Sequence, residues 1–150
     1  MKLFRISKCN FINDLTGKGA ALFGGRWNSK GIYILYTAAT ASLALLETIV
    51  HTSTFPKEGF CILEIEIPEN KILEIKEKQL PSDWRMLPAP ARLRKIGDSF
   101  VRNREYLALK IPSVILPGEF NYLLNPEHPD FKKIRVIKTN KISVDERLVH

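Results

Sequence analysis

The stretch from residue 31 to residue 51, GIYILYTAATASLALLETIVH, places a strand pattern directly before a helix pattern. Residues 32–36 are β-branched, aromatic or aliphatic, and such residues favour a β-strand. Residues 37–40 then supply threonines that can cap a helix. We therefore predict a strand over 32–36 and a helix from about Ala41 to His51.

The rest of the chain mixes strands and helices without regular alternation. Strands are expected over 2–7, 60–67, 113–116, 120–124 and 134–138, and a helix over 99–109 behind a cap at Asp98. In the strand over 60–67, alternate residues are apolar and the others include glutamates, which is typical of a half-exposed strand. The pattern indicates the α+β class.

The chain has 150 residues, of which 45% are hydrophobic and 26% charged, and we expect one domain over residues 1–150. A domain of this size needs no disulfide, so Cys9 and Cys61 are expected to be core thiols in a reducing compartment. The first ten residues lack the apolar run of a secretory signal. The apolar stretch 32–50 contains Glu47 and several hydroxyl groups, which argues against a membrane span. A cytoplasmic protein is expected.

The net charge of +7, from 23 basic and 16 acidic residues, favours anionic ligands. A nucleic acid, a phosphate-bearing small molecule and an acidic protein partner would all satisfy that preference. The basic residues are scattered, and neither a zinc-finger spacing nor a ribonucleoprotein motif accompanies them. Direct nucleic-acid binding is therefore the least favoured of the three.

A glycine-rich segment carries an arginine and a tryptophan. Five of the eight glycines lie between Gly17 and Gly31, together with Arg26 and Trp27. Glycines let backbone N–H groups approach a phosphate, and a guanidinium donates paired hydrogen bonds to phosphate oxygens. The segment does not match the P-loop or dinucleotide fingerprints. It is either an anion site or an ordinary surface loop.

Glu47 interrupts an apolar stripe of the predicted helix, because its helical neighbours Leu43 and Val50 are apolar. An ionised carboxylate in such a stripe is costly unless it has a partner. It should therefore either face a cleft or form a buried ion pair with an arginine. His51 has no other metal ligand at a suitable spacing, so no metal site is predicted.

Several short strings occur in order along nearly the whole chain: Leu22-Phe23-Gly24-Gly25-Arg26-Trp27-Asn28, Leu45-Leu46-Glu47, Gly97-Asp98, Pro112-Ser113 and Asn121-Tyr122-Leu123-Leu124-Asn125-Pro126. In these strings the sequence resembles the RES-domain toxins, the toxic halves of bacterial toxin–antitoxin pairs. The resemblance implies a mixed, split β-sheet with flanking helices, similar to that of ADP-ribosyltransferases. It also implies NAD+ as substrate, no prosthetic group, and an Xre-type helix-turn-helix antitoxin that blocks the active site.

The family is named for an arginine, a glutamate and a serine, which the resemblance places at Arg26, Glu47 and Ser113. Further active-site positions fall on Arg5 and Tyr36, and the loop residues Gly25 and Trp27 are expected to contribute to NAD+ binding. Residues 55–93 carry no matching motif.

The resemblance also implies roles for these residues. Glu47 would stabilise positive charge on the ribose, while Arg5 and Arg26 would hold the pyrophosphate and an attacking phosphate. Tyr36 would stack on the nicotinamide and Ser113 would donate a hydrogen bond to the ligand.

Three functions remain open from the sequence. NAD+ could be degraded, by phosphorolysis with inorganic phosphate as co-substrate or by hydrolysis, or its ADP-ribosyl group could be transferred to a protein. An RNA-directed toxin or a nucleic-acid-binding module is the third possibility. The chain could also form a homo-oligomer.

Overall fold

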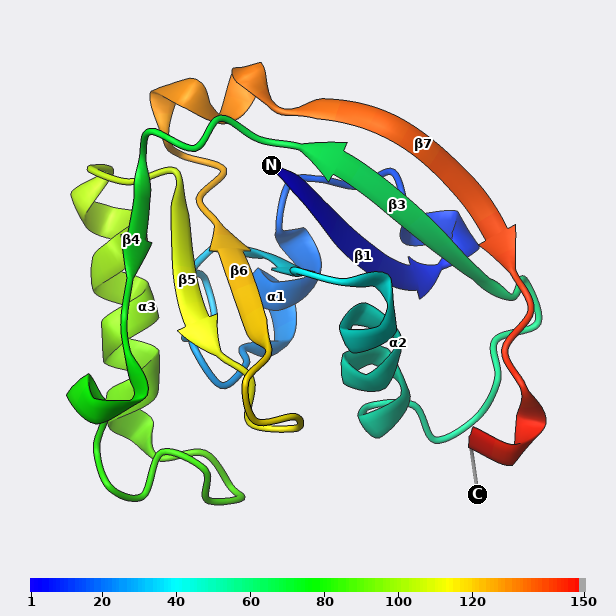
Figure 1. Cartoon of the computed structure of the whole chain (residues 1–150), viewed down its shortest axis with the longest axis horizontal. Helices are drawn as coiled ribbons and strands as arrows, with labels where there is room; N and C mark the ends of the chain where they lie inside the picture. Colours follow the sequence, from blue (N-terminus) through cyan, green and yellow to red (C-terminus); the bar gives the residue numbers. More distant parts are fainter. Residues whose placement is uncertain (149–150) are drawn as a thin grey trace.

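The computed structural model describes residues 1–148, in which seven strands form one mixed sheet (Figure 1). The strands are β1 (Lys2–Lys8), β2 (Leu35–Ala38), β3 (Phe60–Glu66), β4 (Ile72–Glu74), β5 (Ala108–Pro112), β6 (Phe120–Leu124) and β7 (Arg135–Ile142). Their order in the sheet is β4-β5-β6-β2-β1-β3-β7, and only the β4–β5 pair is parallel. The α+β class with a mixed sheet is confirmed.

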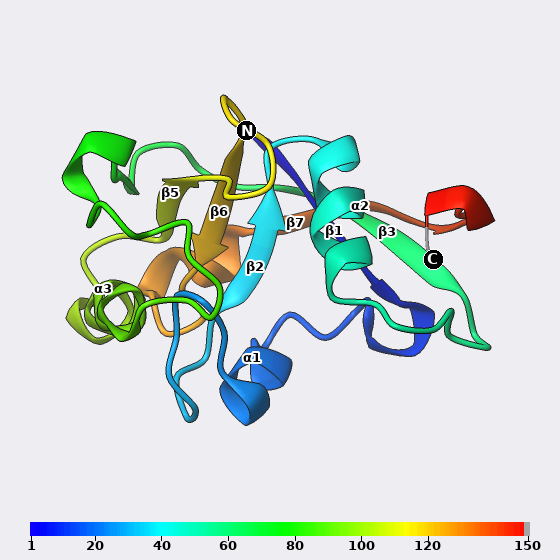
Figure 2. The same ribbon diagram turned by 90° about the horizontal axis from the view of Figure 1, so that it is seen from below.

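Among residues 1–148, three α-helices accompany the sheet: α1 (Lys18–Phe23), α2 (Ala41–Val50) and α3 (Ala91–Asn103). Figure 2 shows the loop that follows α1 running between α1 and α3, with α2 set apart from both. Within residues 1–148 no helix is long and apolar enough to cross a membrane.

Helices α2 and α3 cover the same face of the sheet. Residues of α3 pack in one apolar cluster with Tyr36, whereas residues of α2 pack in another with Ala38. Tyr36 and Ala38 are two residues apart on β2, so their side chains point to the same face. The opposite face carries its own cluster, which includes Leu3, Leu63 and Leu124.

Helix α2 forms as its local pattern predicts. The side chain of Thr40 accepts a hydrogen bond from the Leu43 backbone N–H at 3.1 Å, which caps the first turn. Leu43 and Ala44 are buried against the sheet. The helix ends at Val50, with His51 as its C-cap, so the expected helix is confirmed.

The sheet consists of two halves that meet at a narrow junction. Strands β1 and β3 pair along seven residues and β2 and β6 along four, but β1 and β2 pair only at Phe4 and Ala38. This junction separates β4-β5-β6-β2 from β1-β3-β7, as the expected split sheet requires. Helix α2 is fastened beside the junction, since Thr48 Oγ1 donates to the Ile6 carbonyl at 3.1 Å.

The helix predicted over 99–109 is placed too late. Helix α3 begins at Ala91, and Asp98 lies in its interior rather than at its cap. Leu93, Gly97, Phe100 and Val101 are its buried apolar positions, and their spacing begins well before residue 98.

The strand boundaries also differ in places. Residues 108–112 form the mostly buried strand β5 rather than the end of a helix, and the strand expected over 113–116 is wrong. A short, mostly apolar segment such as this cannot be assigned to a strand or a helix from its periodicity alone. Strand β2 begins at Leu35 instead of residue 32, and β7 continues to Ile142.

Cys9 and Cys61 form a disulfide, so the prediction of two core thiols is wrong. The antiparallel register of β1 and β3 places Ser7 opposite Cys61 and Lys8 opposite Phe60. The chain turns immediately after β1, which leaves the two cysteine Cα atoms 4.8 Å apart across 52 residues of sequence. The reducing compartment inferred from free thiols loses its basis.

Replacing Gly97 by alanine should destabilise the fold. A Cβ built at Gly97 would lie 1.6 Å from the Trp27 carbonyl oxygen, so α3 and the loop would have to separate. We expect a loss of about 1–3 kcal/mol in the free energy of unfolding, as overpacked sites show. Urea denaturation would measure it.

Gly19→Ala is the matched control. Gly19 lies in α1, and a Cβ there meets no atom within 4 Å, so this variant should be as stable as the parent or more stable by about 0.5–1 kcal/mol. Equal stability of the Gly97→Ala and Gly19→Ala variants would contradict the close contact at Gly97.

Candidate active site

A cleft of about 1750 Å³ borders β1, β2 and α2, where the two halves of the sheet meet. Its walls come from β1, α1 and the loop after it, β2, α2, and the segment before α3. Six of the seven site residues expected from the sequence line it: Arg5, Gly25, Arg26, Trp27, Tyr36 and Glu47. Ser113 lies behind this lining and is fully buried.

The loop after α1 is held by a buried asparagine. Asn28 Nδ2 donates to the carbonyls of Ala20 at 2.9 Å and Ile32 at 3.1 Å, and Asn28 Oδ1 accepts from the Tyr36 hydroxyl at 2.7 Å. One side chain thus joins the two ends of the loop to β2. The loop is therefore an ordered wall of the cleft, although its composition is also compatible with a surface loop.

The same loop is fixed to α3. The buried carboxylate of Asp98 accepts from the Ser29 backbone N–H at 2.8 Å and from the Ser29 hydroxyl at 2.6 Å. Gly97 lets the helix approach the Trp27 carbonyl. These contacts fix the loop in which Arg26, the residue before Trp27, lines the cleft.

Gly25 is required beside Tyr36. A Cβ at Gly25 would lie 2.8 Å from Tyr36 Oη and 2.9 Å from Asn28 Oδ1. The Tyr36 hydroxyl also accepts from the Trp27 backbone N–H at 3.3 Å. Burial raises the pKa of Tyr36 well above its usual value, so the hydroxyl remains protonated and donates to Asn28.

Arg26 extends toward the segment that precedes α3. Its Nη1 donates to the carbonyls of Trp84 at 2.8 Å and Met86 at 3.3 Å. Burial lowers the pKa of Arg26, and the negative charge of Glu47 opposes that effect.

Residues 84–94 form a wall of the cleft. Most of them belong to the region 55–93, in which the sequence offered no motif. The lining residues from it are Arg85, Leu87, Pro88, Ala89 and Arg94. Its only sequence signal was the run of prolines at 81, 88 and 90, which marks an irregular segment without identifying a site.

Arg5 enters the cleft from β1. Its Nη1 donates to the carbonyls of Phe11 at 3.2 Å and Ile12 at 2.8 Å. Burial lowers the pKa of Arg5 and the carboxylate of Asp14 opposes this. Both site arginines thus donate to backbone carbonyls, and within residues 1–148 neither forms a salt bridge with a carboxylate.

Glu47 is half-buried on α2, and its carboxylate is held by neutral donors. Asn121 Nδ2 donates to Oε1 at 2.6 Å, and the Ser113 hydroxyl donates to the same oxygen at 3.3 Å. Among residues 1–148 no lysine, arginine or histidine nitrogen lies within 4.0 Å of this carboxylate. The buried ion pair is therefore excluded, and Glu47 faces the cleft.

The hydroxyl of Ser113 contacts Glu47. Its hydroxyl oxygen accepts the backbone N–H groups of Ile115 at 3.1 Å and Leu116 at 3.2 Å, which directs its proton toward Glu47. Asn121 was not among the expected site residues, although it stands in a string that the resemblance used.

The cleft is strongly basic. Its lining includes seven basic side chains: Arg5, Lys8, Lys18, Arg26, Lys30, Arg85 and Arg94. Asp14 and Glu47 are the acidic ones. Such a lining favours a ligand with several negative charges. In the part of the chain that the structure describes, no group of three or more histidine, cysteine, aspartate or glutamate side chains could hold a metal ion.

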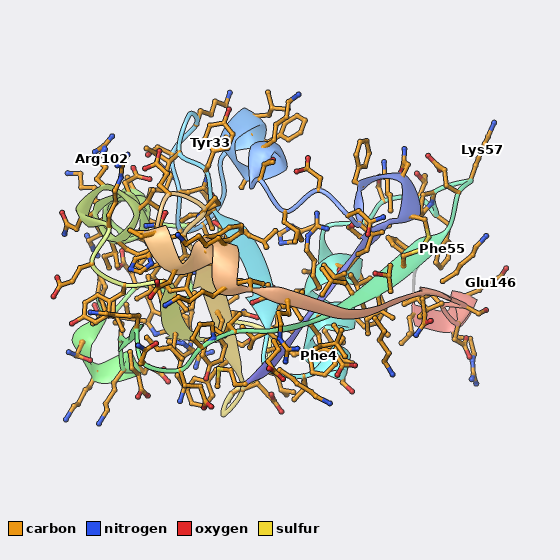
Figure 3. The ribbon with its side chains drawn as sticks, turned by 90° about the horizontal axis from the view of Figure 1, so that it is seen from above. Phe4, Tyr33, Phe55, Lys57, Arg102 and Glu146 are labelled. Carbon is orange, nitrogen blue, oxygen red and sulfur yellow. A yellow bond between two sulfur atoms is a disulfide. The ribbon has the colours of Figure 1, made fainter. Side chains whose placement is uncertain are left out.

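Tyr36→Phe tests the network behind the loop. The change leaves Asn28 Oδ1 and the Trp27 N–H without their partner, so we expect a loss of about 1–3 kcal/mol in unfolding free energy. Chemical denaturation would measure it. Tyr33→Phe is the control, because Tyr33 is exposed on the same loop beside α1 (Figure 3). Equal stabilities of the two variants would contradict the network.

Comparison with known proteins agrees with this geometry. The model of the RES domain family matches residues 2–147. A protein named Toxin Res from Yersinia enterocolitica is 40% identical over 136 residues, which cover 88% of each chain. A protein named Prs ADP-ribosylating toxin from a Sphingobium strain is 37% identical over 142 residues, covering 91% of this chain and 88% of the relative.

A solved structure has the same fold. The crystal structure of the Mycobacterium tuberculosis MbcT–MbcA toxin–antitoxin complex contains a chain that superposes with a TM-score of 0.76. It covers 95% of the present chain and 84% of its own length at 16% sequence identity. At that identity the likeness establishes the fold.

Proposed function

The chain belongs to the RES domain family, and from this premise we propose that it is the toxin of a toxin–antitoxin pair and cleaves the nicotinamide–ribose bond of NAD+. The observation that carries the proposal is the carboxylate of Glu47, held by two neutral donors in a cleft that also contains Arg5 and Arg26. A carboxylate and two arginines in one cleft are suited to a ligand that is anionic at one end and becomes cationic at the other.

The chemistry of the bond explains why a carboxylate is needed. As the bond between ribose C1 and the nicotinamide nitrogen breaks, its electron pair leaves with nicotinamide and positive charge develops on the ribose. A fixed carboxylate stabilises that charge without having to reorganise. Glu47 is proposed for this role, and Arg5 and Arg26 for holding the pyrophosphate.

We propose phosphorolysis as the reaction. An oxygen of inorganic phosphate forms a bond to the ribose carbon while the bond to nicotinamide breaks, giving ADP-ribose 1-phosphate and free nicotinamide. The attacking phosphate and the substrate are both anionic and repel each other. The surplus of basic residues in the cleft supports the proposal, because it lowers that repulsion.

Protein ADP-ribosylation is the second candidate, and the Sphingobium relative named as an ADP-ribosylating toxin favours it. The two reactions need the same carboxylate and arginines and differ in the nucleophile that attacks the ribose. Only the identity of the acceptor separates them.

An antitoxin partner is part of the proposal. The fold is shared with a chain of a toxin–antitoxin complex, and the basic cleft mouth would attract an acidic segment of such a partner and speed association at low salt. We propose an Xre-type antitoxin that covers the cleft. We propose that the protein acts in the cytoplasm because its proposed substrate is NAD+. The cysteines no longer support this location, since they form a disulfide. An antitoxin that binds without reducing NAD+ turnover would contradict the proposal that it covers the cleft.

Incubation of the purified protein with NAD+, with and without inorganic phosphate, tests the reaction. We expect NAD+ to be lost only when phosphate is present, with nicotinamide and a phosphorylated ADP-ribose as products measured by chromatography. Loss of NAD+ without phosphate would indicate hydrolysis, and labelling of an added protein would indicate ADP-ribosyl transfer. Cleavage of RNA with intact NAD+ would contradict all three reactions.

Glu47→Gln should strongly lower turnover while the fold is retained. Glutamine keeps an oxygen that can accept from Asn121 and Ser113, but it removes the negative charge. We expect kcat to fall on the order of 100-fold or more, with little change in melting temperature or in NAD+ binding. Arg26→Ala should instead raise KM more than it lowers kcat, since a phosphate contact exists in both ground and transition states.

Glu146→Gln is the control, because Glu146 is exposed at the end of the molecule far from α3 (Figure 3). Parent-like turnover in Glu47→Gln would remove the carboxylate from the mechanism. Unfolding of Glu47→Gln alone would assign Glu47 a structural role instead.

A further inference from the structure

Two donors converge on one oxygen of Glu47 and leave the other oxygen without a protein donor. Asn121 Nδ2 at 2.6 Å and Ser113 Oγ at 3.3 Å both contact Oε1, whereas no donor within residues 1–148 reaches Oε2. No buried side-chain oxygen in the described chain lacks a hydrogen-bond partner. Oε2 is therefore accessible, and Glu47 lines the cleft.

The two donors are themselves fixed by the sheet. Asn121 lies on β6, where it pairs with Ala38 of β2 and Ile111 of β5. The central position of β6 leaves its backbone little freedom to move. Asn121 also lines the cleft, so its amide borders the same space as Glu47.

Ser113 immediately follows β5, and its backbone N–H donates to the Glu119 carbonyl at 2.8 Å. Its hydroxyl oxygen is occupied by the N–H groups of Ile115 and Leu116, so its single proton is directed to Glu47. The serine thus offers a fixed but longer hydrogen bond, and the short bond from Asn121 is the stronger constraint.

We propose that Asn121 is a positioning residue, which together with Ser113 orients the Glu47 carboxylate so that Oε2 is presented to the ribose. This assignment rests on the proposed function of the cleft. A freely rotating carboxylate would exchange its two oxygens and lose alignment, and misplacement by about 1 Å can cost on the order of 100-fold in rate. The asparagine supplies this orientation without adding a charge, so the full negative charge of Glu47 remains available to the ribosyl cation.

Asn121→Ala removes the short hydrogen bond and should lower kcat for NAD+ about 10- to 100-fold, with KM changed less than threefold. Asn121→Asp retains the shape of the side chain but places a second carboxylate against Glu47, so its kcat should fall further. Ser113→Ala should lower kcat less than Asn121→Ala, since it removes the longer bond. Steady-state kinetics and melting temperatures would be measured for all variants.

Asn140→Ala is the matched control. Asn140 is an exposed asparagine on the edge strand β7 and should retain the kinetics of the parent. Parent-like kcat in Asn121→Ala would overturn the proposal, as would a loss that appears only in KM or only in melting temperature.

Crystal structures of the parent and of Asn121→Ala keep the test independent of turnover. We expect the Glu47 carboxylate to be rotated or present in more than one orientation in the variant. An unchanged, single orientation would overturn the positioning role even if the parent proved inactive on NAD+. An inactive parent with a correctly folded structure would instead contradict the proposed function, while the orientation of Glu47 in the two structures would still decide the role of Asn121.

Discussion

The close approach of α3 to the backbone of Trp27 is the contact on which the cleft depends. Gly97 permits it, and the next residue, Asp98, binds both the N–H and the hydroxyl of Ser29. Two consecutive helix residues thus fix two residues of the loop. Arg26 directly precedes this anchored segment, and its guanidinium is oriented by the carbonyls of Trp84 and Met86 before a ligand binds, which lowers the entropy cost of binding.

Helix α2 shows how one short element can serve both folding and chemistry. Thr48 donates to the carbonyl of Ile6 on β1, while its neighbour Glu47 is held by Asn121 of β6. The helix is therefore attached to both halves of the sheet by adjacent residues. The hydrogen bonds that orient the carboxylate also help to keep the halves together, so stability and activity share the same groups.

The sequence predicted what local patterns determine. The cap at Thr40 and the apolar stripe with Glu47 define α2, and the glycines around Arg26 mark the loop. Neither the hydrogen bond from Asn121, 74 residues from Glu47, nor the carbonyls of Trp84 and Met86, about 60 residues from Arg26, leaves a local pattern. The disulfide follows from strand register, which a single sequence does not specify.

The narrow junction between β1 and β2 has a mechanical consequence. Arg5 belongs to the half with β1, whereas the loop with Arg26 is anchored to α3 on the other half. A ligand held by both guanidiniums would connect the two halves of the sheet, which few hydrogen bonds between β1 and β2 join. Binding of such a ligand would therefore stabilise the whole domain against unfolding.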